Sequence, residues 1–346
     1  MVATAASPDT RWRDVLDTPA TPSALAPRAL LNGLARAGQR VVAVGQRGHV
    51  LYSNDAGQRW EQAQVPVSSD LVAVSFADAN NGWAVGHDGV VLHTSDGGLH
   101  WELQLDGRRI GALMLEYYTR EAAAVASSPE RAAALLEEAK RFASQGADNP
   151  LLDVWFRDAS NGFVVGAFGL ALRTRDGGKS WQPMLHAIDN PKGMHLYAVR
   201  GIGPDLYIVG EQGLAFKLEQ YVERAAERFT TLELPYKGTL FGVVGNERAL
   251  VVHGLRGSAL RSTDAGRSWQ TLTTGLQVGM TASAIDAQGR FMLVSQAGHL
   301  LVSSDDGATF NAARLERPVP AAAVIEAAPG ALVVAGPRGA QALALP

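Results

Sequence analysis

Five aspartates occupy the same position of a repeated eight-residue segment, and their types and spacing are the first hint of chemistry. The segments are SNDAGQRW (53–60), TSDGGLHW (94–101), TRDGGKSW (174–181), STDAGRSW (262–269) and SSDDGATF (303–310). Their aspartates are Asp55, Asp96, Asp176, Asp264 and Asp305. Repeated carboxylates could hold cations or act as acids, but an Asp in a short turn also accepts backbone N–H bonds from that turn. We therefore interpret the five aspartates as structural residues.

The spacing of these aspartates indicates what must position them. They lie 41, 80, 88 and 41 residues apart. A second motif, an apolar run ending in glycine followed by two variable residues and another glycine, occurs seven times, with Ser295 in place of the first glycine in the sixth copy. Its second glycines are Gly48, Gly89, Gly169, Gly213, Gly257, Gly298 and Gly339. Repeats of about 40–45 residues with four short strands each are typical of propeller blades. The sequence predicts an all-β fold, a single seven-bladed propeller of four-stranded blades over residues 1–346.

Two segments interrupt the repeat. The seventh unit ends at ALALP without an outer strand, whereas the N-terminal TRWRDVL (10–16) has the pattern of one, headed by Trp12. We expect this N-terminal strand to close the last blade. Residues 106–150 lie between the second and third blades and predict a helical insertion on one face, because Ser128 precedes Pro129 as a helix N-cap precedes an N1 proline.

The composition excludes several classes of protein. Hydrophobic residues make up 47% of the 346 residues, the net charge is −3 and there is no cysteine. The chain is therefore neither disordered nor built on disulfides or thiolate metal sites, and it lacks the basic stripe of a nucleic-acid binder. No apolar run is long enough to span a bilayer, and no signal-peptide pattern precedes the repeats. We expect no metal and no cofactor.

The repeats resemble a known family. The aspartate segments match the Asp-box, or bacterial neuraminidase repeat. The stretches NGWAVGHDGVVLHTSDGGLHWE (81–102) and NGFVVGAFGLALRTRDGGKSWQ (161–182) resemble the photosystem II assembly and stability factors. The resemblance implies a non-enzymatic binding scaffold, monomeric apart from its client and located in the periplasm or another extracytoplasmic space. It also implies a membrane-protein client, which in a bacterium without photosynthesis could be a transporter.

One face of the propeller is the candidate binding surface. The turns between second and third strands share a face with the connections between blades, and three of the seven turns carry arginine. We expect these arginines, an aromatic turn residue and the first insertion segment to contact the partner. The residues are Arg47, Arg108, Arg109, Tyr117, Tyr118, Arg120, Phe168, Arg256 and Arg338. The alternative is that the helical pair packs only on itself and on the propeller rim.

The rival hypothesis is carbohydrate chemistry, because some Asp-box propellers are sialidases. A sialidase-like glycoside hydrolase needs an arginine triad, a tyrosine nucleophile and an acid carboxylate, and its first arginine stands in an Arg-Ile-Pro motif. Here Arg109 and Ile110 are followed by Gly111. The remaining carboxylates near the blades are interpreted as solvated strand ends or turns; they are Glu61, Glu102, Asp153 and Asp158. We expect no enzymatic activity, and a carbohydrate-binding or hydrolytic propeller stays the alternative.

Overall fold

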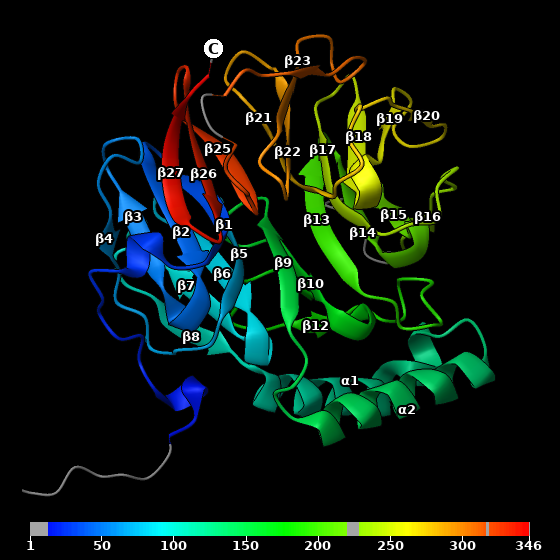
Figure 1. Ribbon diagram of the computed structural model, residues 1–346. Coiled ribbons are helices and arrows are strands. Elements are labelled where there is room, and N and C mark those ends of the chain that lie inside the picture. The colour runs from blue at the N-terminus through cyan, green and yellow to red at the C-terminus, as the bar shows by residue number, and fades with distance from the viewer. Residues whose placement is uncertain (1–12, 220–227, 316–317, 346) are drawn as a thin grey trace, which may run out of the picture.

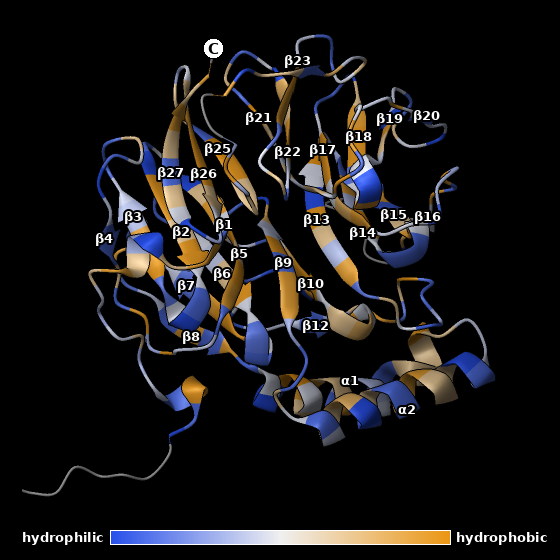
Figure 2. Ribbon diagram, viewed as in Figure 1, coloured by the Kyte–Doolittle hydropathy of each residue, from blue (hydrophilic) through white to orange (hydrophobic). Residues whose placement is uncertain are grey.

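The computed structural model describes residues 13–219, 228–315 and 318–345. In these residues the strands form seven antiparallel sheets, each running from an inner to an outer strand in chain order (Figure 1). Each sheet is one blade. Apolar side chains fill the space between blades, so most strands are orange in Figure 2, whereas the two helices alternate between orange and blue.

The first three blades contain four strands each. Blade one has β1 (Leu31–Ala37), β2 (Arg40–Gly45), β3 (Val50–Ser53) and β4 (Glu61–Gln62). Blade two has β5 (Leu71–Phe76), β6 (Gly82–Gly86), β7 (Val91–Thr94) and β8 (Glu102–Leu105). Blade three has β9 (Leu151–Phe156), β10 (Gly162–Gly166), β11 (Ala171–Thr174) and β12 (Gln182–Pro183).

The next three blades repeat this order. Blade four has β13 (Leu196–Ile202), β14 (Asp205–Gly210), β15 (Ala215–Leu218) and β16 (Thr230–Thr231). Blade five has β17 (Leu240–Gly245), β18 (Leu250–Gly254), β19 (Ala259–Ser262) and β20 (Gln270–Thr271). Blade six has β21 (Met280–Ile285), β22 (Phe291–Ser295), β23 (Leu300–Ser303) and β24 (Asn311–Ala312).

Blade seven differs from the others, because it has three strands in the described part of the chain. These are β25 (Ala323–Ala328), β26 (Ala331–Gly336) and β27 (Gly339–Ala344). In the described part of the expected N-terminal outer strand, residues 13–16, no strand forms. Val15–Asp17 is instead a short 3-10 helix, η1, whose Val15 carbonyl accepts from the amide of Ser68 in the connection before β5. Trp12 lies outside the described residues. A second short helix, η2 (Ala26–Arg28), contacts β27 instead.

The blades pack in a ring. Each inner strand contacts the inner strand of the next blade, from β1 through β25, and β25 in turn contacts β1. In Figure 1 the red β27 and β26 accordingly lie beside the blue β1 and β2. One blade junction is an aromatic stack, in which Trp83 of β6 and Phe156 of β9 lie parallel with ring centroids 3.5 Å apart. Among the described residues no sheet is shared between two blades, so packing between sheets closes this part of the ring.

Two helices lie between β8 and β9. They are α1 (Gly107–Val125), capped by the Asp106 carboxylate, and α2 (Pro129–Gln145), capped by the Ser128 hydroxyl. Figure 1 shows them side by side at one edge of the blades. Neither described helix has a stretch apolar and long enough to cross a membrane.

The inter-helix contact depends on a glycine. A Cβ on Gly111 of α1 would lie 2.7 Å from the Cα of Ala143 and 2.9 Å from the carbonyl oxygen of Phe142. The two helix backbones therefore approach more closely here than any larger residue would allow. Leu135, Ala139 and Phe142 of α2 are buried in the same contact.

Candidate partner-binding face and central channel

The five Asp-box carboxylates accept hydrogen bonds within their own loops. Asp264 Oδ1 accepts from Ser262 Oγ at 2.8 Å and from the Ser268 amide at 2.9 Å, while its Oδ2 accepts from Ser268 Oγ at 2.6 Å. These bonds hold the pKa of Asp264 down at about 2. The loop then ends on Trp269, whose indole donates to the Gly266 carbonyl at 3.1 Å.

The other four boxes repeat this arrangement. Each carboxylate accepts from the Ser or Thr hydroxyl two residues earlier and from the amide four residues later; they are Asp55, Asp96, Asp176 and Asp305. These contacts agree with a structural role. Throughout residues 13–219, 228–315 and 318–345 no cluster of three or more His, Cys, Asp or Glu is placed to hold a metal ion.

Five tight turns between second and third strands line one end of the propeller. They are η3 (Gln46–Gly48), η4 (His87–Gly89), η5 (Ala167–Gly169), η6 (Glu211–Gly213) and η7 (Leu255–Gly257). The first amide of each turn donates to the carbonyl just before the inner strand of its blade, so the turns surround the entrance to the ring. We call this end of the molecule the turn face.

The middle residue of each turn has a left-handed backbone. These residues are Arg47, Asp88, Phe168, Gln212 and Arg256, with φ between 53° and 58°. The glycine that follows is required, because a Cβ on Gly48 would lie 2.2 Å from the Val67 carbonyl oxygen. Asp-box loops contain the same geometry at Ala56 and Ala265, so it is a property of tight turns here and not a sign of function.

The three turn arginines are exposed. Arg47 and Arg256 lie on η3 and η7, and Arg338 lies in the turn between β26 and β27. The Arg47 amide donates to Asp70 Oδ1 at 2.7 Å, which fixes the turn and leaves the guanidinium to solvent. The turn face therefore presents separate positive charges from blades one, five and seven.

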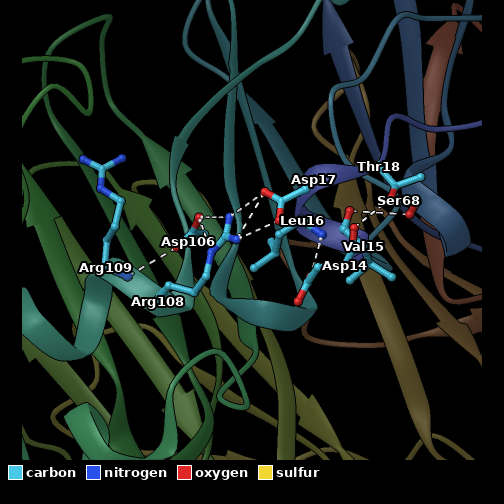
Figure 3. Close-up of polar contacts among 9 residues, drawn as sticks. All are labelled: Asp14, Val15, Leu16, Asp17, Thr18, Ser68, Asp106, Arg108 and Arg109. Carbon is cyan, nitrogen blue, oxygen red and sulfur yellow. Dashed lines mark hydrogen bonds and ion pairs between the residues drawn. The ribbon is translucent and has the colours of Figure 1, made fainter. Parts of the chain in front are cut away.

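Arg108 is engaged within the chain (Figure 3). Its Nη1 lies 3.1 Å from Asp17 Oδ2 and its Nη2 lies 3.0 Å from Asp106 Oδ2, so one guanidinium ties the N-terminal segment to the start of α1. Sequence analysis missed this contact because Asp17 and Arg108 are 91 residues apart. The neighbouring Arg109 donates from Nη1 to the Gln104 carbonyl at 2.7 Å.

The expectation that Tyr118 contacts a partner is wrong. Its side chain is 1% exposed and fills the junction between α1 and the connection after β12. Its hydroxyl lies 3.1 Å from His186 Nδ1 and accepts from the His186 amide at 3.3 Å. Burial lowers the pKa of His186 to about 4, so at neutral pH this imidazole is uncharged and its Nδ1 can accept from the tyrosine.

The remaining predicted residues of α1 are more accessible. Tyr117 is half-buried, packs edge-on against Tyr118 at 5.0 Å and accepts from Gln182 Nε2 at 3.0 Å. Arg120 is exposed and its Nε lies 2.8 Å from Glu121 Oε1. An exposed pair of this kind contributes little stability, so Arg120 can exchange its partner readily.

Phe168 begins a row of aromatic rings that leads from the insertion to the centre of the ring. Its side chain is 41% exposed, and the Arg141 guanidinium of α2 lies 5.4 Å from its ring centre. The centroid distances along the row are 4.9 Å from Phe168 to His195, 6.2 Å from His195 to Tyr197 and 5.6 Å from Tyr197 to Phe241. We call these four residues the aromatic track.

The inner strands surround a cavity of about 650 Å³. Tyr197 and Phe241 line it, as do His87 and Gln296 from the turn face. This volume lies within the range of about 300–1,000 Å³ that is usual for small-molecule sites. We call this cavity the central channel.

The channel wall holds an ion pair between Asp153 of β9 and Arg200 of β13. Asp153 was interpreted as a solvated strand end, and that interpretation is wrong: its side chain is 5% exposed and its Oδ2 also accepts from the Val199 amide at 2.8 Å. Burial raises the pKa of Asp153, and Arg200 opposes that shift.

A comparison among the repeats could have found this pair. The inner-strand residue that pairs with the last-but-one residue of the second strand is Gly or Ala in the six other blades: Gly33, Ala73, Ala198, Gly242, Ala282 and Ala323. Asp153 is the exception, and Arg200 two positions further along the next inner strand is its partner. A buried charge at a position otherwise filled by small apolar residues signals a specific contact.

Comparison with known proteins gives the family. The model of the family described as photosynthesis system II assembly factor YCF48 matches residues 52–111 and 137–313. The photosystem II assembly lipoprotein Ycf48 of Synechococcus sp. (strain CC9902) is 26% identical over 161 residues, which are 46% of this chain and 48% of that protein. The chain thus spans about half the length of the curated relatives it matches.

Solved structures share the fold. One of YCF48 bound to a D1 peptide superimposes with a TM-score of 0.63 at 17% identity, over 92% of this chain and 94% of that one. The glycoside hydrolase GH74 of Niastella koreensis has a TM-score of 0.61 at 14% identity, over 92% of this chain and 53% of that one. At such identities the likeness shows only the propeller architecture. With the Asp-box blades described above, the family match over most of the repeat region shows that this chain belongs to the YCF48 family of photosystem II assembly factors.

Proposed function

We propose that the chain is a non-enzymatic assembly factor that binds an extracytoplasmic segment of a membrane-protein client on its turn face. Family membership supports the assembly role, and a relative of the same fold has been solved with a D1 peptide. The observation that carries the proposal is the turn face itself, where exposed arginines stand around the mouth of a channel of about 650 Å³.

The contact residues of this proposal are those of the predicted set other than Tyr118, which is buried, and Arg108, whose guanidinium pairs with Asp17 and Asp106. They are the turn arginines Arg47, Arg256 and Arg338, with Arg109, Tyr117, Arg120 and Phe168. Arginine binds carboxylates and backbone carbonyls through several N–H donors in a fixed plane, and Arg and Tyr are common anchors of protein interfaces. The helical insertion contributes beside them, because Arg141 of α2 lies over Phe168 of the turn face.

The state of the carboxylates favours binding over catalysis. A glycoside hydrolase needs two carboxyl groups free to act on the substrate. Near the channel mouth Asp70 accepts from the Arg47 amide, Asp153 pairs with Arg200, and Glu211 accepts from the His195 amide at 2.8 Å. Each of these groups holds backbone or a cation in place, which supports a scaffold without a cofactor.

The client and the compartment follow from the family as proposals. The relative from Synechococcus is called a lipoprotein, which supports a lumenal or periplasmic location. The D1 peptide of the solved relative supports a membrane protein as the client. In a bacterium without photosynthesis the client would be another membrane protein, with a transporter as one candidate.

The test is chemical crosslinking and mass spectrometry of the tagged chain in its native cells. We expect specific capture of one membrane protein, and loss of at least nine-tenths of that capture in the double variant Arg47→Glu with Arg256→Glu. Arg248→Glu is the matched control, because Arg248 is 72% exposed but lies in the turn between the first and second strands of blade five, away from the turn face. Equal capture by the double variant and the wild type would reject this face.

A further inference from the structure

One cationic side chain of the central channel, Arg200, has only one of its guanidinium nitrogens bonded within the described part of the protein. Arg200 is the one Lys or Arg among the described residues that line the channel, and 42% of its side chain is accessible. Its contacts with Asp153 and with the Val199 carbonyl, the latter at 2.6 Å, both involve Nη1. Its Nε and Nη2 donors are therefore open to a ligand in the channel.

Besides Asp153, the carboxylate and imidazole side chains of the described channel wall are Asp70, which accepts from the Arg47 amide, and the histidines His87 and His253. His253 Nδ1 donates to the Met280 carbonyl at 3.0 Å, and its Nε2 accepts from Ser283 Oγ at 2.9 Å. Burial lowers the pKa of His253 to about 4, so it is neutral at pH 7. Asp153 is buried and contacts only Nη1 of Arg200, so the other guanidinium nitrogens are not used by this pair.

The aromatic track connects this cation to the surface. Tyr197 stands three residues before Arg200 on β13, and both line the channel with Phe241. Outward from Tyr197 the rings of His195 and Phe168 continue to the exposed turn η5. A ligand that follows the track would pack apolar or aromatic groups on the rings and bring a negative group to Arg200.

From this arrangement we infer that Arg200 is the receptor for a carboxylate of the client, held in the channel next to an aromatic or other large apolar side chain that packs on Tyr197 and Phe241. This inference rests on the proposed function and adds to it the chemistry that selects the client. A carboxylate fits because guanidinium and carboxylate form charge-assisted hydrogen bonds, which are shorter and stronger than those between neutral groups.

The first experiment uses three small probes that separate the two features of the ligand. N-acetyl-phenylalanine has a ring and a carboxylate, N-acetyl-phenylalaninamide has the ring without the charge, and acetate has the charge without the ring. Binding is measured by calorimetry or by chemical shift. We expect the acid to bind at least tenfold more tightly than the amide and than acetate.

The variants are chosen so that a folding defect cannot imitate the result. Arg200→Met combined with Asp153→Asn removes both charges of the pair together, so no buried carboxylate is left alone, and it should abolish the preference for the acid over the amide. Asp153→Asn alone frees Arg200 from its partner and should tighten binding of the acid severalfold. Arg248→Met, at a distant ion pair with Asp306, should leave binding unchanged.

Several outcomes would overturn the inference. Equal binding of acid and amide, or wild-type binding by the double variant, would show that Arg200 does not receive the carboxylate. Acetate binding as tightly as the acid would identify a site for free small anions and reject the peptide ligand.

A second arm separates this inference from the proposed function. The same double variant is crosslinked in native cells, where we expect at least a tenfold loss of client capture. Undiminished capture would overturn the role of Arg200 and leave the assembly function standing. No capture by the wild type would overturn the proposed function, and the peptide assignment with it, whatever the probes show.

Discussion

The carboxylates of Asp264 and Asp153 have different roles in this chain: the first stabilises its own loop, and the second forms a buried ion pair. Asp264 accepts three hydrogen bonds from the loop that carries it, so its environment favours the charged form. Asp153 is buried in a strand, where desolvation disfavours the charged form and Arg200 makes it tolerable. The partners of Asp264 belong to its own Asp-box, whereas the partner of Asp153 belongs to the neighbouring blade.

The Asp-box carboxylates should make the free energy of unfolding depend on pH in the acidic range. The folded pKa of Asp264 is about 2, below its ordinary value of 3.8. Its stabilisation is therefore present above about pH 4 and is lost as the pH falls through about 2. We expect Asp264→Ala to lower the free energy of unfolding by about 1 kcal/mol at pH 6, as for a few partly exposed hydrogen bonds.

Urea unfolding between pH 6 and pH 2 measures this effect. The difference in the free energy of unfolding between Asp264→Ala and wild type should shrink steadily below pH 4. Asp148→Ala, at an exposed carboxylate of the loop before β9, should show no such difference. If the free energies of unfolding of Asp264→Ala and wild type differed as much at pH 2 as at pH 6, the ionised carboxylate would not be the source of the stabilisation.

At the scale of elements, the helical insertion is held by a few close contacts. The α1 helix packs on the turn η4, where a Cβ on Gly89 would lie 2.9 Å from Gly107. Tyr118 anchors it to the connection after β12, and Gly111 lets α2 approach. The insertion is thus a packed part of the turn face, and its outer side, with Arg120, remains accessible.

Replacing Gly111 should loosen the helical pair without disturbing the blades. In Gly111→Val the new side chain meets backbone of α2 at 2.7–2.9 Å, so the helices must separate. Overpacking of this kind costs about 2 kcal/mol. We expect amide hydrogen exchange of α1 and α2 to speed up roughly 30-fold, with exchange of the blades unchanged.

The control for this experiment is Ala112→Val. It introduces the same valine side chain at the next residue of α1, which is exposed. It should leave exchange near the wild-type rate. Equal protection of α2 in Gly111→Val and Ala112→Val would show that the close approach of the helices does not hold them together.

At the scale of the whole molecule, the ring closes at its least regular blade. Blade seven has three strands in the described residues and no Asp-box, and it meets blade one through β25 and β1. Gly57 of the first Asp-box contacts Val333 of β26, since a Cβ there would lie 2.4 Å from its side chain. Loop packing therefore supports this junction, which no sheet of the described residues spans.

Among the third strands of the blades, β27 of blade seven should have the fastest amide hydrogen exchange. The β27 strand pairs with β26 along its full length, but no described strand pairs with its other edge. In blade six the equivalent β23 pairs with β24 through Leu301 and Val302. Unpaired edge amides exchange with solvent quickly.

Hydrogen exchange resolved by peptide mass spectrometry measures this difference within one molecule. Peptides over Gly339–Ala344 should exchange at least tenfold faster than those over Leu300–Ser303. Equal rates would show that another part of the molecule covers the outer edge of β27.

The sequence by itself determined the repeat, and with it most of the fold. Glycines and Asp-boxes at fixed spacing specify tight turns through local backbone geometry, so the strands, their order and the helical segment follow from residues close together in the chain. The same local rules predicted the exposed arginines at Arg47 and Arg256, because a turn residue between two strands points to solvent.

Only the tertiary structure decided which residues meet across blades. The pairs Arg108–Asp17, Tyr118–His186 and Asp153–Arg200 join segments 91, 68 and 47 residues apart, and only Asp153 is marked in the sequence, by its departure from the small residues of the other repeats. The N-terminal segment has the composition of an outer strand, yet Val15–Asp17 lies against the connection before β5, because hydrogen bonding to Ser68 and the Arg108 ion pair hold it there. Local sequence sets the shape of each blade, while burial and charge between blades set the site.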